Sequence, residues 1–362
     1  MAAMAPGLYS VCVAQDGSGR QVTVAQLEQF LAAQRTAHTN DGATEQQLRS
    51  VELAERLTEL TLDRLKAQYQ PGEETVLELD VLADLSAFLD PPANEIPEQD
   101  PLAEAEQQTM IAAATDFVTG TLKRLPDFLA TRTTRSFEDV PVFTADNSFQ
   151  SGMHQMGTFV RQVAFRNGRE FATDADPADG AANSHGAPAA VLNSSGEFGP
   201  ILATIMTDSE HGSIGFVRWE QISGGVAAVF RYDVPKEAAH YEIKFCCAWN
   251  SAKEAFETYD GTPAYHGTIT LDPSSGAILG LTLEAEFDNL NEPPQFGLLV
   301  RYGAVEIEGK SLTCPLSSAV IVRSTQTARK RVWDVVHVND MRFTDYRRFG
   351  STSRVLANTP AR

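Results

Sequence analysis

The spacing of apolar residues changes near Phe128, and this change restricts the possible folds more than any other feature of the chain. Before Phe128, apolar residues recur with the period of about 3.6 residues that is typical of amphipathic helices. After it, short segments alternate apolar and polar residues, as half-buried strands do. Helices and strands do not alternate along the chain, which argues against a parallel sheet built from β–α–β units.

The first part of the chain predicts helices. Thr23–Gln26 (TVAQ) fits a capping box, in which the side chains at both ends of the first turn bond backbone N–H groups. Thr44–Gln47 (TEQQ) offers a second box, and we expect it to open a longer helix that runs through Leu65 and ends at Gln70–Gly72. A third helix is expected up to Asp90.

Four prolines within Pro91–Pro101 rule out a continuous helix there, because proline lacks the backbone N–H that a helix needs. We therefore predict an acidic helical domain over residues 1–90 and a proline-rich linker over residues 91–105. Residues 106–350 are expected to form a helix followed by a β-domain, and residues 351–362 a disordered tail.

Local signals support antiparallel strands after Phe128. Asn167-Gly168 lies between strand-like flanks and predicts a tight hairpin, since both turn positions need a positive φ. Asp272–Gly276 (DPSSG) predicts a second turn. Phe198–Asp208 reads as one short helix with Pro200 in its first turn.

We predict an α+β fold: an N-terminal helical domain followed by a large, curved antiparallel sheet of about ten to twelve strands. We expect the helix Phe198–Asp208 to cover the apolar face of this sheet.

The charge of the chain limits its partners. The formal net charge is −19, which disfavours nucleic acid and anionic membrane surfaces. Residues 41–106 hold 17 acidic and 4 basic residues, whereas residues 301–362 hold 11 basic and 5 acidic ones. The two ends are expected to neutralise each other within the fold, or the basic end to bind an anionic partner. No run of about 18 apolar residues suggests a transmembrane helix.

Adjacent cysteines stand in the strand-like segment YEIKFCCAWN. Neighbouring side chains in a strand point to opposite faces, so Cys246 and Cys247 cannot address one metal ion or one partner unless the strand bulges. We predict a disulfide between Cys247, or alternatively Cys246, and Cys314, which lies at the end of another predicted strand. The alternative is that all three are reduced, buried thiols.

No other pattern predicts a site. The chain has no GxSxG, Walker or dinucleotide-binding glycine motif, and its histidines lack the spacing of metal ligands. We assign no catalytic residue, no metal site and no cofactor. Asp208 and His211 are interpreted as turn residues, and Arg329–Arg331 as a cluster that protects a strand edge or contacts the acidic helical domain.

Several segments carry a resemblance to known proteins: LKRLPDFLATRTTRSFED, FGPILATIMTD, YHGTITLDPSSGAILGLTLEAEF and NDMRFTDYRRF. Over most of its length the chain resembles a group of uncharacterised secreted bacterial proteins that are abundant in acidobacteria. From about Leu125 to Phe349 it is similar to the lipoprotein-carrier (LolA/LolB) and RseB-like half-barrel, which implies that the curved sheet is an open half-barrel with a plugging helix. The resemblance implies a periplasmic or secreted protein, although Met1–Gly17 lacks the basic and continuous apolar regions of a signal peptide.

These observations lead to a hypothesis of a non-enzymatic envelope protein. Its half-barrel would bind an acyl chain, a lipid or a lipoprotein beneath a hydrophobic cover of Phe198, Ile201, Leu202, Ile205 and Met206. The alternative is a protein-interaction module with a solid β-core and an acidic helical recognition domain. A hydrolase whose residues meet only in the fold is a third possibility. The partner is thus a hydrophobic ligand or an envelope protein, and the sequence does not set the oligomeric state.

Overall fold

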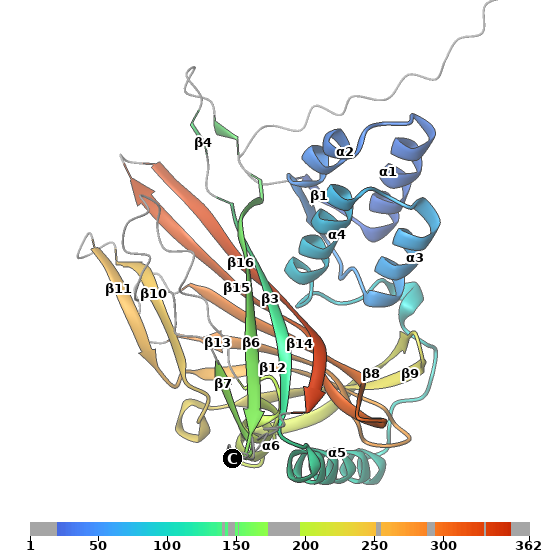
Figure 1. Cartoon of the computed structure of the whole chain (residues 1–362), viewed down its shortest axis with the longest axis vertical. Coiled ribbons are helices and arrows are strands. Elements are labelled where there is room, and N and C mark those ends of the chain that lie inside the picture. Colours follow the sequence, from blue (N-terminus) through green and yellow to red (C-terminus); the bar gives the residue numbers. More distant parts are fainter. Residues whose placement is uncertain are drawn as a thin grey trace, which may run out of the picture.

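The computed structural model describes residues 20–139, 142–143, 149–150, 152–172, 196–250, 255–287, 294–328 and 331–348. Figure 1 shows a long, twisted sheet with a group of N-terminal helices beside its upper part and two further helices at its lower end. The fold is α+β, as the change of period predicted.

Four helices form the N-terminal part: α1 (Val24–Thr36), α2 (Asp41–Leu48), α3 (Glu59–Tyr69) and α4 (Glu73–Leu85). The capping box at α1 is confirmed, since Gln26 N donates to Thr23 Oγ1 at 3.2 Å and Thr23 N donates to Gln26 Oε1 at 3.0 Å. Gln70, at the end of α3, adopts a left-handed conformation with φ of 46°, which stops that helix.

The predicted long helix from Thr44 to Leu65 is wrong. Thr44 lies inside α2, whose first turn is capped by Asn40. The chain then forms strand β2 (Val51–Leu53), which pairs in parallel with β1 (Arg20–Val22) before α3 begins. The pairing with a strand 31 residues earlier overrides the helical spacing of the leucines, because that spacing contains no information about distant backbone partners.

The proline-rich segment after α4 lies on its neighbours. It contains a short 3₁₀ helix, η1 (Ala93–Glu95). Thr58 Oγ1 and Thr61 Oγ1 donate to the buried carboxylate of Glu95 at 2.5 and 2.6 Å, which fastens the segment to the start of α3. Helix α5 (Glu104–Arg124) follows. None of the helices in the described part of the chain has the length and apolar composition needed to cross a bilayer.

Ten antiparallel strands form the main sheet. They are β3 (Phe128–Asp139), β6 (His154–Arg166), β7 (Arg169–Ala172), β8 (Ser213–Ile222), β9 (Gly225–Val234), β12 (Ala264–Leu271), β13 (Ile278–Glu286), β14 (Gln295–Ile307), β15 (Lys310–Ala328) and β16 (Arg331–Arg348). Their order is β7-β6-β3-β16-β15-β14-β13-β12-β9-β8, and the end strands β7 and β8 do not pair with each other, so the sheet is open.

Smaller strand pairs lie outside the main sheet. β10 (Ile243–Asn250) pairs with β11 (Ala255–Gly261), and β4 (Val142–Phe143) pairs with β5 (Phe149–Gln150). The predicted turns are confirmed: Asn167 and Gly168 have φ of 50° and 73° between β6 and β7, and Gly276 has φ of 70° between β12 and β13. The predicted tail, residues 351–362, lies outside the described residues.

Both faces of the sheet are covered. On β15, Val320 and Val322 belong to the main core, which the sheet shares with α5 and with α6 (Pro200–Ser209). The alternate residues Ala319 and Ile321 instead pack against α4 and the residues that follow it. We call the α5–α6 side the front and the α4 side the back. Burial on both faces explains why Ala319–Val322 of β15 form a short continuous apolar run rather than an alternation.

The contact between α4 and the back combines apolar packing with buried charges. Val81 packs among Phe137, Val336 and Val338. The ring of Phe88 lies so close to the backbone of Gly297 that a Cβ there would be 2.4 Å from the ring Cζ atom.

Three arginines of the sheet meet three buried aspartates at this contact. Arg135 donates to Asp340 Oδ2 through Nε at 3.0 Å, and Arg342 Nε lies 3.1 Å from Asp340 Oδ1. Asp80 of α4 lies 3.5 Å from Arg135 and 3.6 Å from Arg342.

Asp84 of α4 accepts a hydrogen bond from Arg301 at 3.0 Å. The basic C-terminal strands therefore do neutralise part of the acidic helical region, as the first of the two interpretations of the charge asymmetry expected.

Replacing Asp340 with alanine should destabilise the protein by about 2–4 kcal/mol, because it leaves two partly buried arginines without their shared carboxylate. Chemical denaturation at neutral pH measures this loss. Glu308→Ala is the matched control: Glu308 pairs with Arg348 at 3.1 Å, but both side chains are more than half exposed, so its removal should cost less than about 1 kcal/mol. Equal losses in the two variants would contradict the importance of the buried network.

Candidate functional site

Helix α6 covers the front of the sheet, where the sequence predicted a hydrophobic cover. Pro200 occupies its first turn, and Gly199 before it has φ of 138°, a conformation that favours glycine. The residues predicted to form the cover are all buried in the main core: Phe198, Ile201, Leu202, Ile205 and Met206. Their burial is observed, whereas ligand binding by them stays a prediction.

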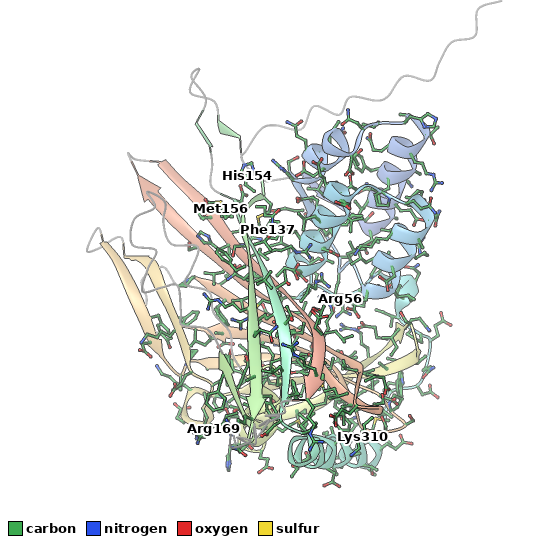
Figure 2. All side chains as sticks on the ribbon, in the orientation of Figure 1. Arg56, Phe137, His154, Met156, Arg169 and Lys310 are labelled. Atoms are coloured by element: carbon green, nitrogen blue, oxygen red, sulfur yellow. The ribbon has the colours of Figure 1, made fainter. Side chains whose placement is uncertain are left out.

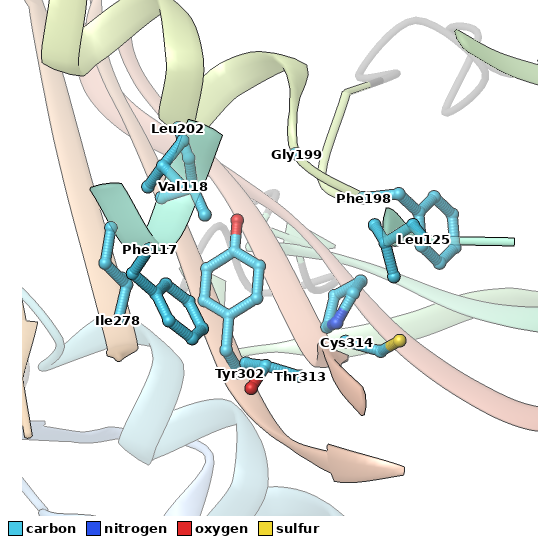
Figure 3. Close-up of a pocket in the computed structure, with 11 residues that line it drawn as sticks. Phe117, Val118, Leu125, Phe198, Gly199, Leu202, Ile278, Tyr302, Thr313 and Cys314 are labelled. Atoms are coloured by element: carbon cyan, nitrogen blue, oxygen red, sulfur yellow. The ribbon is translucent and has the colours of Figure 1, made fainter. Parts of the chain in front are cut away.

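A small cavity lies between α5, α6 and strands β13 to β15. Phe198 and Leu202 line it, together with Phe117, Tyr302 and Cys314 (Figure 3). Its volume is about 20 Å³, which is room for one water molecule. The hydroxyl group of Tyr302 is buried and has no hydrogen-bond partner among the described residues. A molecule in this cavity would therefore meet the Tyr302 hydroxyl and Thr313 in otherwise largely apolar surroundings.

A pair of buried carboxyl groups fastens the start of α6 to the sheet. Gly196 N donates to Glu170 Oε2 at 2.9 Å, and Ser318 Oγ donates to Glu197 Oε1 at 3.3 Å. Burial, with the nearby charge of Glu197, raises the pKa of Glu170 to about 8. Glu170 therefore keeps its proton at neutral pH, which avoids two adjacent buried charges. Sequence reasoning missed this pair because the two residues lie on either side of a long, unpatterned segment.

Asp208 fastens the end of α6. Its carboxylate accepts hydrogen bonds from His240 N at 2.8 Å and from Tyr265 Oη at 2.6 Å, and it lies 2.7 Å from His240 Nδ1. The hydrogen bond with Asp208 raises the pKa of His240. His211 contacts Asp208 only through the backbone, so the structure brings Asp208 together with His240 rather than with its sequence neighbour.

The histidines that the structure describes do not gather around a common point. His266 Nδ1 lies 2.9 Å from Glu286 and its Nε2 lies 3.6 Å from Glu284. Across the described ranges, no three His, Cys, Asp or Glu side chains are arranged to hold a metal ion. Arg329 and Lys330 lie outside the described residues.

Cys314 is a free thiol, 1% exposed, in the main core. Burial raises its pKa to about 12, so the thiol stays protonated. Strand β10 contacts β15, and its backbone bulges at Cys247: Cys246 pairs with Thr258, whereas Ala248 pairs with Glu257. A bulge of this kind is the condition under which the sequence analysis allowed Cys246 and Cys247 to address one partner. The side chains of Cys246 and Cys247 lie outside the described residues, so the Cys247–Cys314 disulfide stays a prediction.

A second cavity, of about 230 Å³, lies between the helical region and the back of the sheet. Arg56 and Arg301 line it, with threonine hydroxyls from β12 and β13. Arg56 forms an ion pair with Glu220, and Arg301 Nε lies 3.1 Å from Glu59, so both cations are matched within the protein. The cavity could hold a small polar molecule. Sequence reasoning missed it because it arises only where distant segments meet.

Several apolar side chains on β6 and β7 are exposed. Met156, Phe159, Val160 and Phe171 are 49, 47, 64 and 50% exposed. Figure 2 shows Met156 near one end of β6 and Arg169 beyond the other. Large apolar side chains that remain exposed together often mark a binding surface. No sequence signal distinguished them from core residues, because an edge strand and a central strand have similar patterns.

Replacing Glu170 with glutamine should flatten the dependence of stability on pH. The folded-state pKa of Glu170, about 8, lies above its unfolded value, so its contribution to stability is largest below pH 4.5 and is lost as the pH rises towards 8. Glu170→Gln should therefore be more stable than the unmodified protein at pH 9, by on the order of 2 kcal/mol, with no gain at pH 4. Denaturation at both pH values measures this. Glu286→Gln, at an exposed position, is the control, and an equal pH dependence in both variants would contradict the assignment.

The predicted disulfide is tested by the mass of the intact protein after export to an oxidising compartment. A deficit of about 2 Da that reduction removes, mapped to peptides containing Cys247 and Cys314, would confirm it. The full mass of reduced thiols would show that these cysteines are buried thiols instead.

No protein-family model matches the sequence, and no curated protein matches it. The chain is similar in structure to MucB, in two solved complexes with MucA. One is the MucA/MucB complex of Pseudomonas aeruginosa, with 9% identity, 62% of this chain and 93% of that chain covered, and a TM-score of 0.20. The other is MucB in complex with MucA(peri), with 11% identity, 66% and 94% covered, and a TM-score of 0.19. Scores of this size carry no argument about function, and the fold assignment rests on the sheet itself.

Proposed function

We propose that this chain is a non-enzymatic protein of the bacterial envelope that binds another protein through its surface, while the interior of its half-barrel is filled by its own side chains. The observation that carries the proposal is the size of the cavity beneath α6, about 20 Å³. Pockets that enclose small-molecule ligands measure about 300–1,000 Å³. The envelope location rests on the resemblance of the sequence to secreted bacterial proteins.

The front of the sheet is filled by rings as well as by α6. Phe198 packs against Phe128 and Phe343 with ring centroids 5.2 Å apart in each case, and Phe128 stacks on Phe165 at 5.2 Å. These rings fill the space between α6 and the front of the sheet. The half-barrel in this conformation is therefore a packed core.

An acyl chain could enter only if α6 left the sheet. That step would expose several fully buried apolar side chains, each worth about 1.5–3 kcal/mol. It would also break the hydrogen bonds of Asp208 with Tyr265 and His240 at one end of α6 and those of Glu170 and Glu197 at the other. Both costs favour the interaction module over the lipid carrier.

The surface used for a partner is not the acidic face of α4. Asp80 and Asp84, which contribute to the acidity of the helical region, are directed to the arginines of the sheet. The large exposed apolar side chains of the described residues include the group on β6 and β7. We therefore assign partner binding to the sheet rather than to the helices.

The test is a native mass spectrum of protein exported to a bacterial periplasm, followed by a denatured spectrum of the same sample. We expect the mass of the chain alone in both spectra, because the packed interior leaves no room for a lipid. A non-covalent adduct with the mass of a fatty acid or phospholipid, lost on denaturation, would overturn the proposal in favour of a lipid carrier with a displaceable α6.

A further inference from the structure

The cavity between the helical region and the back of the sheet is open to solvent, and we call it the junction cavity. Its volume is about 230 Å³. Pockets that enclose drug-sized ligands measure about 300–1,000 Å³, so this one suits a smaller molecule. Arg56 lines it where the N-terminal helices meet the sheet (Figure 2). Glu59, Ser223 and Gly224 are exposed residues of its lining, so a solute can enter from that side.

The charged groups of the junction cavity balance one another. Glu220, which is 6% exposed, forms an ion pair with Arg56. Arg301 donates to Asp84 at 3.0 Å, and its Nε lies 3.1 Å from Glu59. An anionic ligand would compete with these carboxylates for the arginines, and a cationic ligand would compete with the arginines for the carboxylates. Breaking a buried pair is costly, so the lining favours a neutral ligand.

Polar groups remain available to such a ligand. Arg56 Nε is buried and has no hydrogen-bond partner among the described residues. The hydroxyls of Thr268 and Thr282 bond each other at 2.8 Å, and Thr270 lies on the same strand as Thr268. A threonine hydroxyl can both donate and accept hydrogen bonds. The buried side chain of Leu299 adds apolar surface to the same lining.

A glycine in β13 leaves space toward this cavity. Gly280 pairs with Thr270, and both residues line the cavity. A Cβ at position 280 would lie 3.6 Å from Thr270 Oγ1, its nearest neighbour, so packing does not require glycine there. A bulge at Leu279 adjoins it, yet the φ of Gly280 is not positive, so the backbone does not require glycine either. Glycine inside a strand can mark the close approach of a ligand.

We propose that the junction cavity binds a neutral, polyhydroxylated molecule of the size of a monosaccharide. A sugar ring has hydroxyl groups along its edge and apolar C–H groups on its faces, which match the two kinds of surface in the lining. Arg56 and Thr270 bond its hydroxyls, and Gly280 leaves room for the ring. This site goes beyond the proposed function, because the partner surface on β6 and β7 lies at the opposite end of the strand order from β8.

The experiment is isothermal titration calorimetry of the full chain with glucose, galactose, mannose and N-acetylglucosamine. Gluconate and protonated glucosamine serve as an anionic and a cationic counterpart of the neutral sugars. We expect at least one neutral sugar to bind with a Kd of about 1 mM or below. Its charged counterparts should bind at least about tenfold more weakly, because they disturb the paired charges. The affinity for the neutral sugar should not change as salt is added.

Two variants assign the binding to the junction cavity. Gly280→Ala places a methyl group in the space beside Thr270 and should weaken binding at least about tenfold. Thr270→Val removes the hydroxyl and keeps the shape of the side chain, and should weaken binding about fivefold. Circular dichroism with thermal unfolding verifies that the variants fold. One variant adds a group and the other removes one, so if either fails to fold the other remains as the test.

Matched controls are available on other strands. A Cβ at Gly215 of β8 would be 4.0 Å from the side chain of Gln107, an ordinary contact, and Gly215 does not line the junction cavity. Thr134 of β3 is half-buried and does not line it either. Gly215→Ala and Thr134→Val should therefore bind the sugar as the unmodified protein does.

The inference is overturned if no neutral sugar binds, if a charged counterpart binds as tightly, or if the folded site variants keep full affinity. These outcomes leave the proposed function in place. A sugar held at this affinity is lost during purification, so the native spectrum of the exported protein still shows the chain alone. A lipid adduct in that spectrum overturns the proposed function and not the sugar site, so the two failures are told apart.

Discussion

The arrangement of the molecule depends on the buried ionic network between α4 and the back of the sheet. Asp80 and Asp84 of the helix, and Asp340 of β16, lie among arginines from β3, β14 and β16. Buried charges are costly unless they are paired, so this contact is satisfied only when helix and strands meet in one register. The apolar contacts of Val81 and Phe88 then exclude water from the same area. This contact fixes the helical layer on the back, and the front is left to α5 and α6.

Coverage of both faces leaves the edges as the places where the sheet can meet other proteins. On the front, the cavity lined by Phe198 and Leu202 has room for about one water molecule, and a more open hollow of about 240 Å³ lies between α5 and α6. The 230 Å³ cavity on the back already has its arginines paired. At the edges, α5 and the proline-rich segment bond to β8, whereas β6 presents Phe159 and Val160 to solvent.

Local signals in the sequence predicted local structure well. The capping box at Thr23, the Asn167-Gly168 hairpin and the helix that begins at Pro200 each depend on residues a few positions apart, and each is confirmed. The errors and omissions arose where contact with a segment distant in the sequence determines the local structure. Val51–Leu53 is a strand because Arg20–Val22 lies beside it, and β10 pairs only with β11 rather than joining the main sheet. For the site, the positions of the α6 residues followed from their spacing. The Glu170–Glu197 pair and the exposed apolar side chains of β6 did not, because they depend on which strands become neighbours.

The position of helix α4 also affects how the protein unfolds. Every residue from Glu78 to Asp84 is buried. Leu79, Leu82 and Ala83 belong to the core of the N-terminal helices, whereas Val81 belongs to the cluster on the sheet. Helix α4 thus contributes buried residues to two hydrophobic cores, so its detachment would expose both of them to solvent. The helical region and the sheet are therefore expected to unfold as a single cooperative unit. Amide hydrogens in α4 should then exchange with solvent only when the whole molecule unfolds.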